Sequence, residues 1–501
     1  MIIISGAIIL TLTETNVIDQ AEDATYAYNN KQYFELITNE YLMFRVSDEA
    51  KGKTSIEVFE MLKEKINKNA ENVEYITGSK AMNITIDNTY KYTALYDGEV
   101  KYGKYAYLDI ADGSIELKQT GYIQGTNPLV EYDGDYIITG TTTENNVRVM
   151  EEGTYNITIK DLNIDLRELD NVCAFNANAG GKTTGNIVNI DIDGVNSLIS
   201  NGSAAALGFP NAEPNIEEVK NASKLIIQGD GDLYAESTGF GAGIGTGYSG
   251  WNVAYGDANN IIINSGNITC KSGNSPAIGA ALNFNANNII INGGNIKTLN
   301  NKGFTGIGTR ANKEGLGILK NLQINGGNIT AYGGVHGSAI GCDNYSANGE
   351  ILITGGRLNL INVKDFKTKQ SAAFGLGCNN ITITGGTIIA ETDNNTGVWT
   401  IDITENINIT GGNILITSAV SDFAVPPTTG TNSVYLTEIQ LQNVTEEVQV
   451  TSFTTSDNID YGIKDMYTTV DGKLYVYLPT GERTITIKAG EKEYKVTVVT
   501  G

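Results

Sequence analysis

Aromatic side chains stand close to carboxylates and amides in loop-like stretches between residues 248 and 345. Carbohydrate sites use this combination, because rings give apolar platforms with a polar edge while oxygen-rich side chains hydrogen-bond to hydroxyl groups. The candidate ligand-binding residues are Tyr248, Trp251, Tyr255, Asp257, Phe284, Asp343 and Tyr345. The alternative is that long loops fold over one face of the protein and that these rings fill the gap beneath them.

Residues for catalysis are harder to find. His336 is the single histidine and stands in a Gly-rich turn without a matched nucleophile or acid. Arg310 and its charged neighbours could form an acid/base group, but charged side chains on an exposed loop are the better explanation. Asp191 and Asp193 share a strand face and could pair as hydrolase carboxylates, or could face solvent. We therefore expect no catalytic residues, no cofactor and no metal site, and we favour a protein that is not an enzyme.

A repeated motif supplies the elements that must position the candidate residues. It has the form Asn-Ile-Ile-Ile-Asn-Gly-Gly, with variations, and its copies start 28, 33, 29, 30 and 26 residues apart. The six copies begin at Asn260, Asn288, Asn321, Glu350, Asn380 and Asn406. Each unit holds three short β-type runs separated by Gly or Asn, and such a unit cannot bury its apolar face alone. The pattern predicts a right-handed, three-sided parallel β-helix of roughly ten coils with a rise of about 4.8 Å per coil.

Alignment of the units assigns residues to the interior and to the surface. The first run should point inward at Ile261, Ile289, Leu322, Ile351, Ile381 and Ile407. The third run should do so at Ile244, Ile278, Ile307, Ile340 and Leu376. An outward column of the first run is also apolar, at Ile226, Ile262, Ile290 and Leu352. A row of exposed branched side chains is typical of an interface, so we expect a domain, a loop or another subunit to cover it.

The cysteines test this register. Cys270 falls at an inward-facing small position, and Cys342 and Cys378 follow the third run in successive units. The latter two should be direct neighbours in adjacent coils, but parallel side chains about 4.8 Å apart fit disulfide geometry poorly. We therefore expect buried free thiols.

The regions outside the repeat predict two further domains. Residues 1–128 contain one helix signal, a Thr54–Glu57 capping box, surrounded by aromatic runs that resemble strands, including 33–37 and 41–46. Residues 433–501 read as a compact all-β unit after a Pro-rich linker. The expected domains are an N-terminal α+β attachment domain at 1–128, the β-helix at 129–424 and a small C-terminal β domain at 425–501.

The residues that follow Tyr136, the Gly241-Ala-Gly-Ile-Gly segment and the Ile-x-Gly-Gly-x-Ile units resemble a β-helix family of Gram-positive bacterial surface proteins and their phages. The tail around Tyr461-Gly-Ile-Lys-Asp-Met and Leu478-Pro-Thr-Gly-Glu is similar to the module that often closes such chains. This resemblance covers about 130–501 and implies carbohydrate binding. No site residue of the family can be carried over to this chain, because the matching residues form corners and core.

Composition limits the class of partner. The formal net charge is −23, which excludes nucleic acid, since phosphate binding needs clusters of Lys and Arg. The apolar run at 1–12 is too short to span a bilayer and lacks the features of an export leader, so we read it as a strand and expect no membrane insertion.

These observations favour a glycan-recognising or structural β-helix in a phage virion appendage, a fibre or spike that contacts a Gram-positive host. Its expected partners are cell-surface polysaccharide, other virion proteins through the N-terminal domain, and copies of itself. The alternatives are a secreted bacterial adhesin and a polysaccharide depolymerase.

Overall fold

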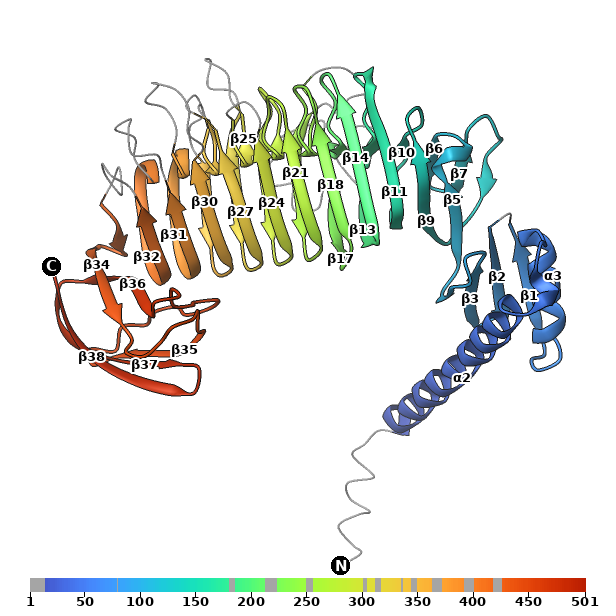
Figure 1. Cartoon of the computed structure of the whole chain (residues 1–501), viewed down its shortest axis with the longest axis horizontal. Helices are drawn as coiled ribbons and strands as arrows, with labels where there is room; N and C mark the ends of the chain where they lie inside the picture. Colours follow the sequence, from blue (N-terminus) through green and yellow to red (C-terminus); the bar gives the residue numbers. More distant parts are fainter. Residues whose placement is uncertain are drawn as a thin grey trace, which may run out of the picture. The chain divides into compact units, whose positions relative to one another are not determined.

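The chain is mainly β-sheet and contains a β-solenoid of about 8 turns, as the computed structural model shows (Figure 1). The predicted fold class is therefore confirmed. The structure describes residues 14–78, 80–179, 185–211, 223–248, 256–300, 304–310, 317–334, 337–343, 349–362, 372–391, 401–417 and 426–501. Contacts divide the chain into two compact units: residues 1–108 with 132–137, and residues 109–131 with 138–501.

The first unit combines helices with a small antiparallel sheet. Its helices are α2 (Glu14–Arg45), the 3-10 helix η1 (Asp48–Ala50) and α3 (Ser55–Ile66). Its sheet has the order β1 (Val73–Thr77), β2 (Ala81–Ile86), β3 (Tyr90–Leu95) and β4 (Val100–Tyr102). The predicted capping box begins α3: the Thr54 hydroxyl accepts from the Glu57 N–H, and the Glu57 carboxylate accepts from the Thr54 N–H at 2.8 Å.

The expectation of strands at 33–37 and 41–46 was wrong, because residues 33–45 belong to the long helix α2. Ile37, Tyr41 and Phe44 recur at helical spacing and are buried in one core with α3 and the sheet. Aromatic residues have high β-propensity, but tertiary packing of this face overrides that local preference. The run at 1–12, read as a strand, lies outside the described residues.

Three columns of parallel strands form the solenoid, one on each side of the coil (Figure 1). The first column contains β11 (Thr154–Asp170), β13 (Ile187–Asp193), β17 (Lys224–Gly229), β20 (Asp257–Ile263), β23 (Ala286–Ile291), β26 (Leu319–Ile324) and β29 (Gly349–Ile353). The second contains β14 (Val195–Asn201), β18 (Asp232–Ser237), β21 (Asn267–Ser272), β24 (Asn295–Asn300), β27 (Asn328–Gly333) and β30 (Arg357–Asn362). The third contains β10 (Val147–Val149), β12 (Phe175–Asn176), β15 (Leu207–Gly208), β19 (Ile244–Gly245), β22 (Ile278–Ala280), β25 (Ile307–Thr309) and β28 (Ile340–Gly341).

Two long strands, β31 (Phe374–Glu391) and β32 (Ile401–Thr417), run through successive sides of the last coils, and β11 likewise continues into the second column, where it pairs with β14. Before the first coils the chain forms β5 (Tyr105–Asp109), the 3-10 helix η2 (Ile110–Asp112), β6 (Ile115–Lys118), β7 (Gly121–Gln124), β8 (Val130–Glu131) and β9 (Asp135–Thr142). A two-residue strand, β16 (Pro210–Asn211), pairs antiparallel with β20. Because β6 pairs in parallel with β10, the stacking extends N-terminally of residue 129.

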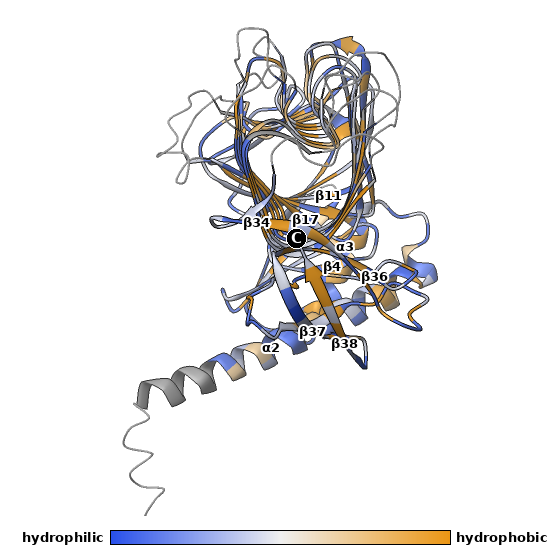
Figure 2. Cartoon of the chain, turned by 90° about the vertical axis from the view of Figure 1, so that its left-hand side faces the viewer, coloured by the Kyte–Doolittle hydropathy of each residue, from blue (hydrophilic) through white to orange (hydrophobic). Residues whose placement is uncertain are grey.

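The predicted core columns are confirmed, except for the last position of the third column, Leu376. All six inward residues of the first column are at most 3% exposed, and Ile289, Ile296 and Ile307 of one coil are at most 2% exposed. The coils superpose when viewed along the stack (Figure 2). Alternation along the strands therefore separates a continuous apolar core from an outer surface.

Asparagine at the start of the repeat has a conformational role. Asn260, Asn288 and Asn321 have φ of 55°, 56° and 55°, a left-handed conformation that Asn tolerates better than most residues. Their side chains also form a ladder, since Asn288 donates to Asn260 and Asn321 donates to Asn288 at 2.8 Å. The local change of backbone direction at these positions, inside β20, β23 and β26, is thus fixed by backbone and side chain together.

One part of the predicted register was wrong. Ile340 pairs with Phe374, which is fully buried, rather than with Leu376. The register shifts between Phe374 and Cys378, so a count of residues after the third run fails in this coil. Cys342 and Cys378 still contact one another as buried free thiols; their mutual interaction and burial raise the pKa of Cys378. Cys270 is buried between Ala235 and Thr298, as expected for an inward site.

The C-terminal residues form a small antiparallel module. Its strands are β33 (Thr428–Thr429), β34 (Asn432–Gln440), β35 (Val450–Thr455), β36 (Lys473–Pro479), β37 (Gly481–Ala489) and β38 (Lys492–Thr500). β34 pairs with β36, and β35, β37 and β38 form a three-stranded sheet. The module belongs to the same compact unit as the solenoid, so the two units divide the chain differently from the three expected domains.

Candidate functional site

Four of the seven predicted ligand-binding residues lie in the described part of the chain: Tyr248, Asp257, Phe284 and Asp343. The other three, Trp251, Tyr255 and Tyr345, lie outside the described residues, as does His336.

Asp257 is buried rather than placed at the edge of a groove. It is 7% exposed, and its carboxylate accepts hydrogen bonds from the backbone N–H of Asn285 at 2.8 Å and from the side-chain amide at 3.1 Å. Burial raises the pKa of Asp257 above its ordinary value, although both hydrogen bonds oppose the shift. The carboxylate therefore links two neighbouring coils through Asn285 and is not presented to solvent.

Asp343 is 1% exposed and lies near the half-buried Arg310. Burial lowers the pKa of Arg310, while the negative charge of Asp343 acts in the opposite direction. The Arg310 guanidinium stacks 3.8 Å from the centroid of the Phe304 ring. The ring of Tyr248 lies 5.9 Å from that of Phe240, which is 44% exposed. The described side chains of this region, such as Tyr248 with Phe240 and Arg310 with Phe304, pack against one another. Ligand binding by the predicted loop residues stays a prediction.

The predicted interface residues lie in register on the outer face of the first column. Ile226, Ile262 and Ile290 follow one another on β17, β20 and β23, and Leu352 continues the column after Gln323. Each is half-buried. No described contact identifies what covers this column.

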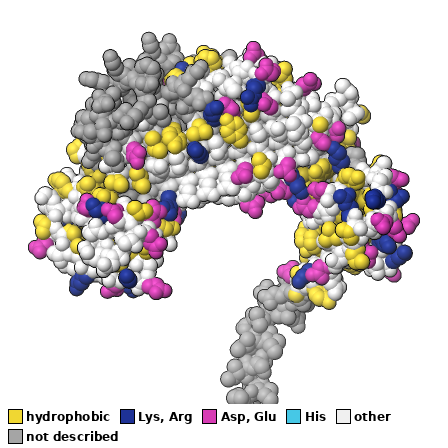
Figure 3. Space-filling view, in the orientation of Figure 1, with side chains coloured by type: hydrophobic (Ala, Val, Ile, Leu, Met, Phe, Trp, Pro, Cys, Tyr) yellow, Lys and Arg dark blue, Asp and Glu magenta, His cyan; other side chains and the backbone are white. Residues whose placement is uncertain are grey.

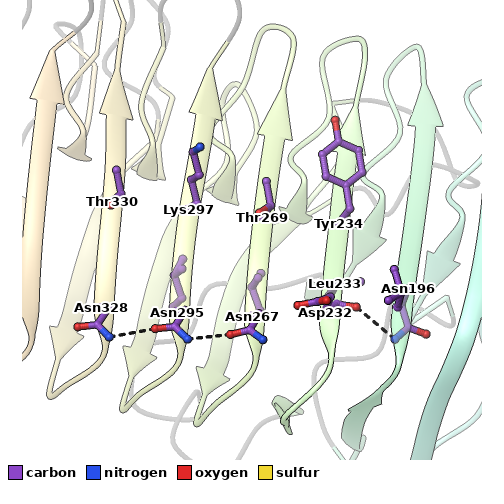
Figure 4. A pocket seen from close by; sticks show the side chains of 13 residues that line it. Asn196, Asp232, Leu233, Tyr234, Asn267, Thr269, Asn295, Lys297, Asn328 and Thr330 are labelled. Atoms are coloured by element: carbon purple, nitrogen blue, oxygen red, sulfur yellow. Dashed lines mark hydrogen bonds between the residues drawn. The ribbon is translucent and has the colours of Figure 1, made fainter.

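A groove lies on the outer face of the second column, which the sequence did not single out (Figure 4). It spans β14, β18, β21, β24 and β27 and has a volume of about 420 Å³. Its lining residues are Val195, Asn196, Asp232, Leu233, Tyr234, Asn267, Ile268, Thr269, Asn295, Ile296, Lys297, Asn328 and Thr330. In Figure 3, a broad area of uncharged polar side chains and backbone follows the lower part of the coils on this face.

One wall of the groove is a row of amides spaced by one coil. Asn295 donates from its side-chain amide to Asn267 at 2.7 Å, and Asn328 donates to Asn295 at 3.0 Å. All three side chains are exposed. Each amide has two N–H groups and a carbonyl oxygen with two lone pairs, so a ladder bond leaves one N–H and one lone pair available on Asn295. The row therefore offers alternating donors and acceptors at the repeat distance of the coils.

A second row, nearer the middle of the strands, consists of Tyr234, Thr269, Lys297 and Thr330, which are direct neighbours in the strand register. The Tyr234 ring and the Lys297 amine rise from the same face of the sheet (Figure 4). Tyr234 thus adds an aromatic surface beside the amides, which is the pairing of chemistries that the sequence had suggested for the loops.

Charged side chains beside Tyr234 are paired with one another. The Tyr234 hydroxyl donates to Glu236 at 2.8 Å, and the Lys271 amine lies 2.7 Å from the same carboxylate. Glu236 has only 10% of its side chain exposed. Burial and the hydrogen bond to Glu236 raise the pKa of Tyr234, so the phenol stays neutral. Beyond them Arg167 pairs with Asp165 at 2.8 Å.

The groove has a sequence signal that could have revealed it. Asn267, Asn295 and Asn328 each follow the glycine of the corner, and the residue two positions later points outward. The sequence placed Asn295 at the start of the second strand of its unit and indicated no role for its side chain. Turn asparagines and ladder asparagines have the same sequence spacing, so only the stacked coils separate the two roles.

The described residues contain no cluster of three or more His, Cys, Asp or Glu side chains that could hold a metal ion. Among them there is also no helix long and apolar enough to cross a membrane. Fold and groove define a β-solenoid with a polar groove on one outer face. Comparisons of the chain with protein-family models, curated proteins and solved structures find no match.

Proposed function

We propose that the protein is a glycan-binding β-solenoid and that a stretch of polysaccharide lies along the groove, parallel to the stack of coils. The amide row of Asn267, Asn295 and Asn328 is the observation that supports this function. Sugar hydroxyls both donate and accept hydrogen bonds, and each exposed amide offers both functions. A polymer of similar units would meet equivalent groups on successive coils.

The proposal is for binding without cleavage. The carboxylate of Glu236, which could otherwise serve as an acid or base, is held by Tyr234 and Lys271. A general acid or base must be within hydrogen-bonding reach of the substrate proton. A group that is nearly buried and already paired is poorly placed for that role.

The chain offers a matched pair of variants to test the groove. Asn292 belongs to a second ladder, at the other end of the same Gly293-Gly294 turn and outside the lining of the groove: it donates to Asn264 at 2.8 Å and accepts from Asn325 at 2.9 Å. Asn295→Ala and Asn292→Ala therefore each remove two amide hydrogen bonds of similar geometry. Each should cost about 1–3 kcal/mol of stability, taking about 0.5–1.5 kcal/mol per bond. Only the groove variant should weaken glycan binding, by about tenfold or more for the loss of about 1.4 kcal/mol.

The assay is binding of the full chain to a panel of neutral and acidic cell-wall and capsular polysaccharides, with melting curves for both variants. Reducing ends and unsaturated uronates are followed in the same samples. Binding to no member of the panel would remove the proposed function. Equal loss of binding in both variants would show that the amide row affects binding only through the stability of the fold. Release of reducing ends or unsaturated uronates would show that the protein cleaves the polysaccharide, as a depolymerase does.

The proposed setting is a phage appendage that contacts polysaccharide on a Gram-positive host, attached through the N-terminal residues. The alternative is a secreted bacterial adhesin. Sedimentation of the protein with purified virions supports the first setting, and an export leader in the genomic reading frame supports the second.

A further inference from the structure

The row Thr269, Lys297 and Thr330 differs from the rest of the groove because its side chains form no hydrogen bond or ion pair with another residue that the structure describes. Lys297 is exposed and forms no ion pair with any carboxylate in the described ranges. Neither threonine hydroxyl hydrogen-bonds to another described residue, and both side chains are half-exposed. One cation is thus flanked by two hydroxyl groups on the coils before and after it.

Two neighbouring cationic side chains, Lys271 and Arg167, do have ion-pair partners. Lys271, one coil before Lys297, has its charge offset by Glu236 at 2.7 Å, and Arg167 is offset by Asp165. Among the described residues that line the groove, the one carboxylate is Asp232, which is two coils from Lys297 in the register through Asn267 and Asn295. At about 4.8 Å per coil this separation is about 10 Å along the stack. It is comparable with the Debye length of about 8 Å at physiological salt, so Asp232 does not neutralise Lys297.

We propose that Lys297 and its flanking threonines bind the carboxylate of an acidic sugar in the polysaccharide. A carboxylate has two oxygens, each able to accept more than one hydrogen bond, and the row offers an ammonium group and two hydroxyl donors. This inference rests on the proposed function and specifies the class of glycan.

The charge of the whole chain limits how acidic that glycan can be. The formal net charge is −23, so a densely charged polyanion is repelled on approach. Lys297 is the one cation among the groove's lining residues, and it has no acidic partner in the part of the chain that the structure describes. The expected ligand therefore carries a carboxylate on one sugar of each repeating unit, with neutral sugars between, which meet the amides and the Tyr234 ring.

The experiment compares four defined polymers by calorimetric titration of the full chain. Hyaluronan alternates a carboxylated and a neutral sugar, polygalacturonate is charged at every sugar, dextran is neutral, and dextran sulfate carries sulfate groups. Hyaluronan should bind more tightly than the other three, and reduction of its carboxyl groups to alcohols should abolish the preference. Raising the salt concentration from 50 to 300 mM should weaken hyaluronan binding, since exposed ion pairs are screened.

Variants assign the effect to one residue. Lys297→Met should lose about tenfold in affinity for hyaluronan, the scale of one charge-assisted hydrogen-bonded pair. Lys297→Arg should retain most of the affinity. The control is Lys320→Met, which removes a half-buried lysine from the first column, outside the groove, and should leave affinity unchanged.

The outcomes separate this inference from the proposed function. A chain that binds dextran or carboxyl-reduced hyaluronan as well as hyaluronan, or that is unaffected by Lys297→Met, still binds glycans but has no carboxylate site. Equal binding of dextran sulfate and hyaluronan shows a general anion effect and overturns the carboxylate assignment. Binding to none of these polymers or to the wider panel removes both proposals.

Discussion

Substitution of Asp465 tests how the C-terminal module is held against the solenoid. The segment around this residue lies along the glycine corners of successive coils. The Asp465 carboxylate accepts a hydrogen bond from the Gly356 N–H at 2.8 Å, and a side chain added at Gly355 would place its Cβ 2.6 Å from the same carboxylate. The Lys464 carbonyl accepts from the N–H of the equivalent glycine, Gly386, one coil later at 2.6 Å. The module thus contacts backbone groups at the glycine corners, in addition to side-chain contacts such as that between Arg357 and Glu447.

Two terms set the expected cost of Asp465→Ala. Loss of a charge-assisted hydrogen bond costs about 1.5–3 kcal/mol. Asp465 also has φ of 51°, and alanine in the left-handed region costs about 1–2 kcal/mol more than a residue suited to it. We expect Asp465→Ala to destabilise docking by about 2–4 kcal/mol. This is less than the sum of the two terms, because Asp465 is only half-buried and water can partly replace the lost hydrogen bond.

Companion variants separate the two terms. Asp465→Gly relieves the backbone and removes only the hydrogen bond, so it should be less harmful than alanine. Asp465→Asn keeps both an acceptor and the backbone preference and should cost about 1 kcal/mol or less. Asp460→Ala, at an exposed position nearby, is the control and should change little.

The assay is hydrogen exchange at the Gly356 amide with calorimetric melting of the full chain. Exchange should accelerate in the order Asp465→Asn, Asp465→Gly, Asp465→Ala, and melting should follow the same order. The reasoning fails if alanine and glycine are no worse than the Asp460 control, or if the Gly356 amide exchanges at the same rate in all of them.

Three further outcomes are expected. Ile307→Ala, at a fully buried position, should cost about 2–5 kcal/mol in chemical denaturation, and a change below 1 kcal/mol would contradict the core assignment. Partial burial acts to raise the pKa of Asp457, but hydrogen bonds from Arg483, from Thr455 and from its own backbone N–H hold this pKa below its ordinary value. The ionised Asp457 carboxylate therefore stabilises the protein above the unfolded pKa, and this stabilisation is lost as pH falls through the folded pKa. Asp457→Asn should lower the melting temperature at pH 7 and match the unaltered chain at pH 2, and a constant difference would refute the linkage. Cys342 and Cys378 should react with a thiol reagent only on unfolding, because both are fully buried, whereas rapid native labelling would show that they are accessible.

The fold was largely predictable because each unit of the repeat carries the same pattern of inward apolar residues and glycine turns. Inward isoleucines at positions such as Ile289 and Ile307 recur in each unit, so an error in one unit is corrected by the others. The register failed at Phe374, where a shift in the strand breaks the count. The prediction of secondary structure failed in α2. This segment occurs once in the chain, and its aromatic residues suit a strand locally.

The candidate site was less predictable. The sequence pointed to aromatic loops and to Asp257 and Asp343, but both aspartates are buried in the structure. Adjacent polar residues in a loop do not reveal whether they bind each other or a ligand. The groove was missed because Asn267, Asn295 and Asn328 are 28 and 33 residues apart and become neighbours only when the coils stack.

The sequence by itself determined the solenoid, its three strands per coil, most of the inward columns and the glycine corners, because period-two alternation and left-handed backbone positions are local requirements. Tertiary structure alone decided which outward side chains from different coils form one surface. It paired Glu236 with Lys271, left Lys297 without an acidic partner among the described residues, and placed Asp465 on a glycine corner more than 100 residues away. The physical reason is that these relations depend on distance in space between distant parts of the chain, and stacking of the coils sets that distance.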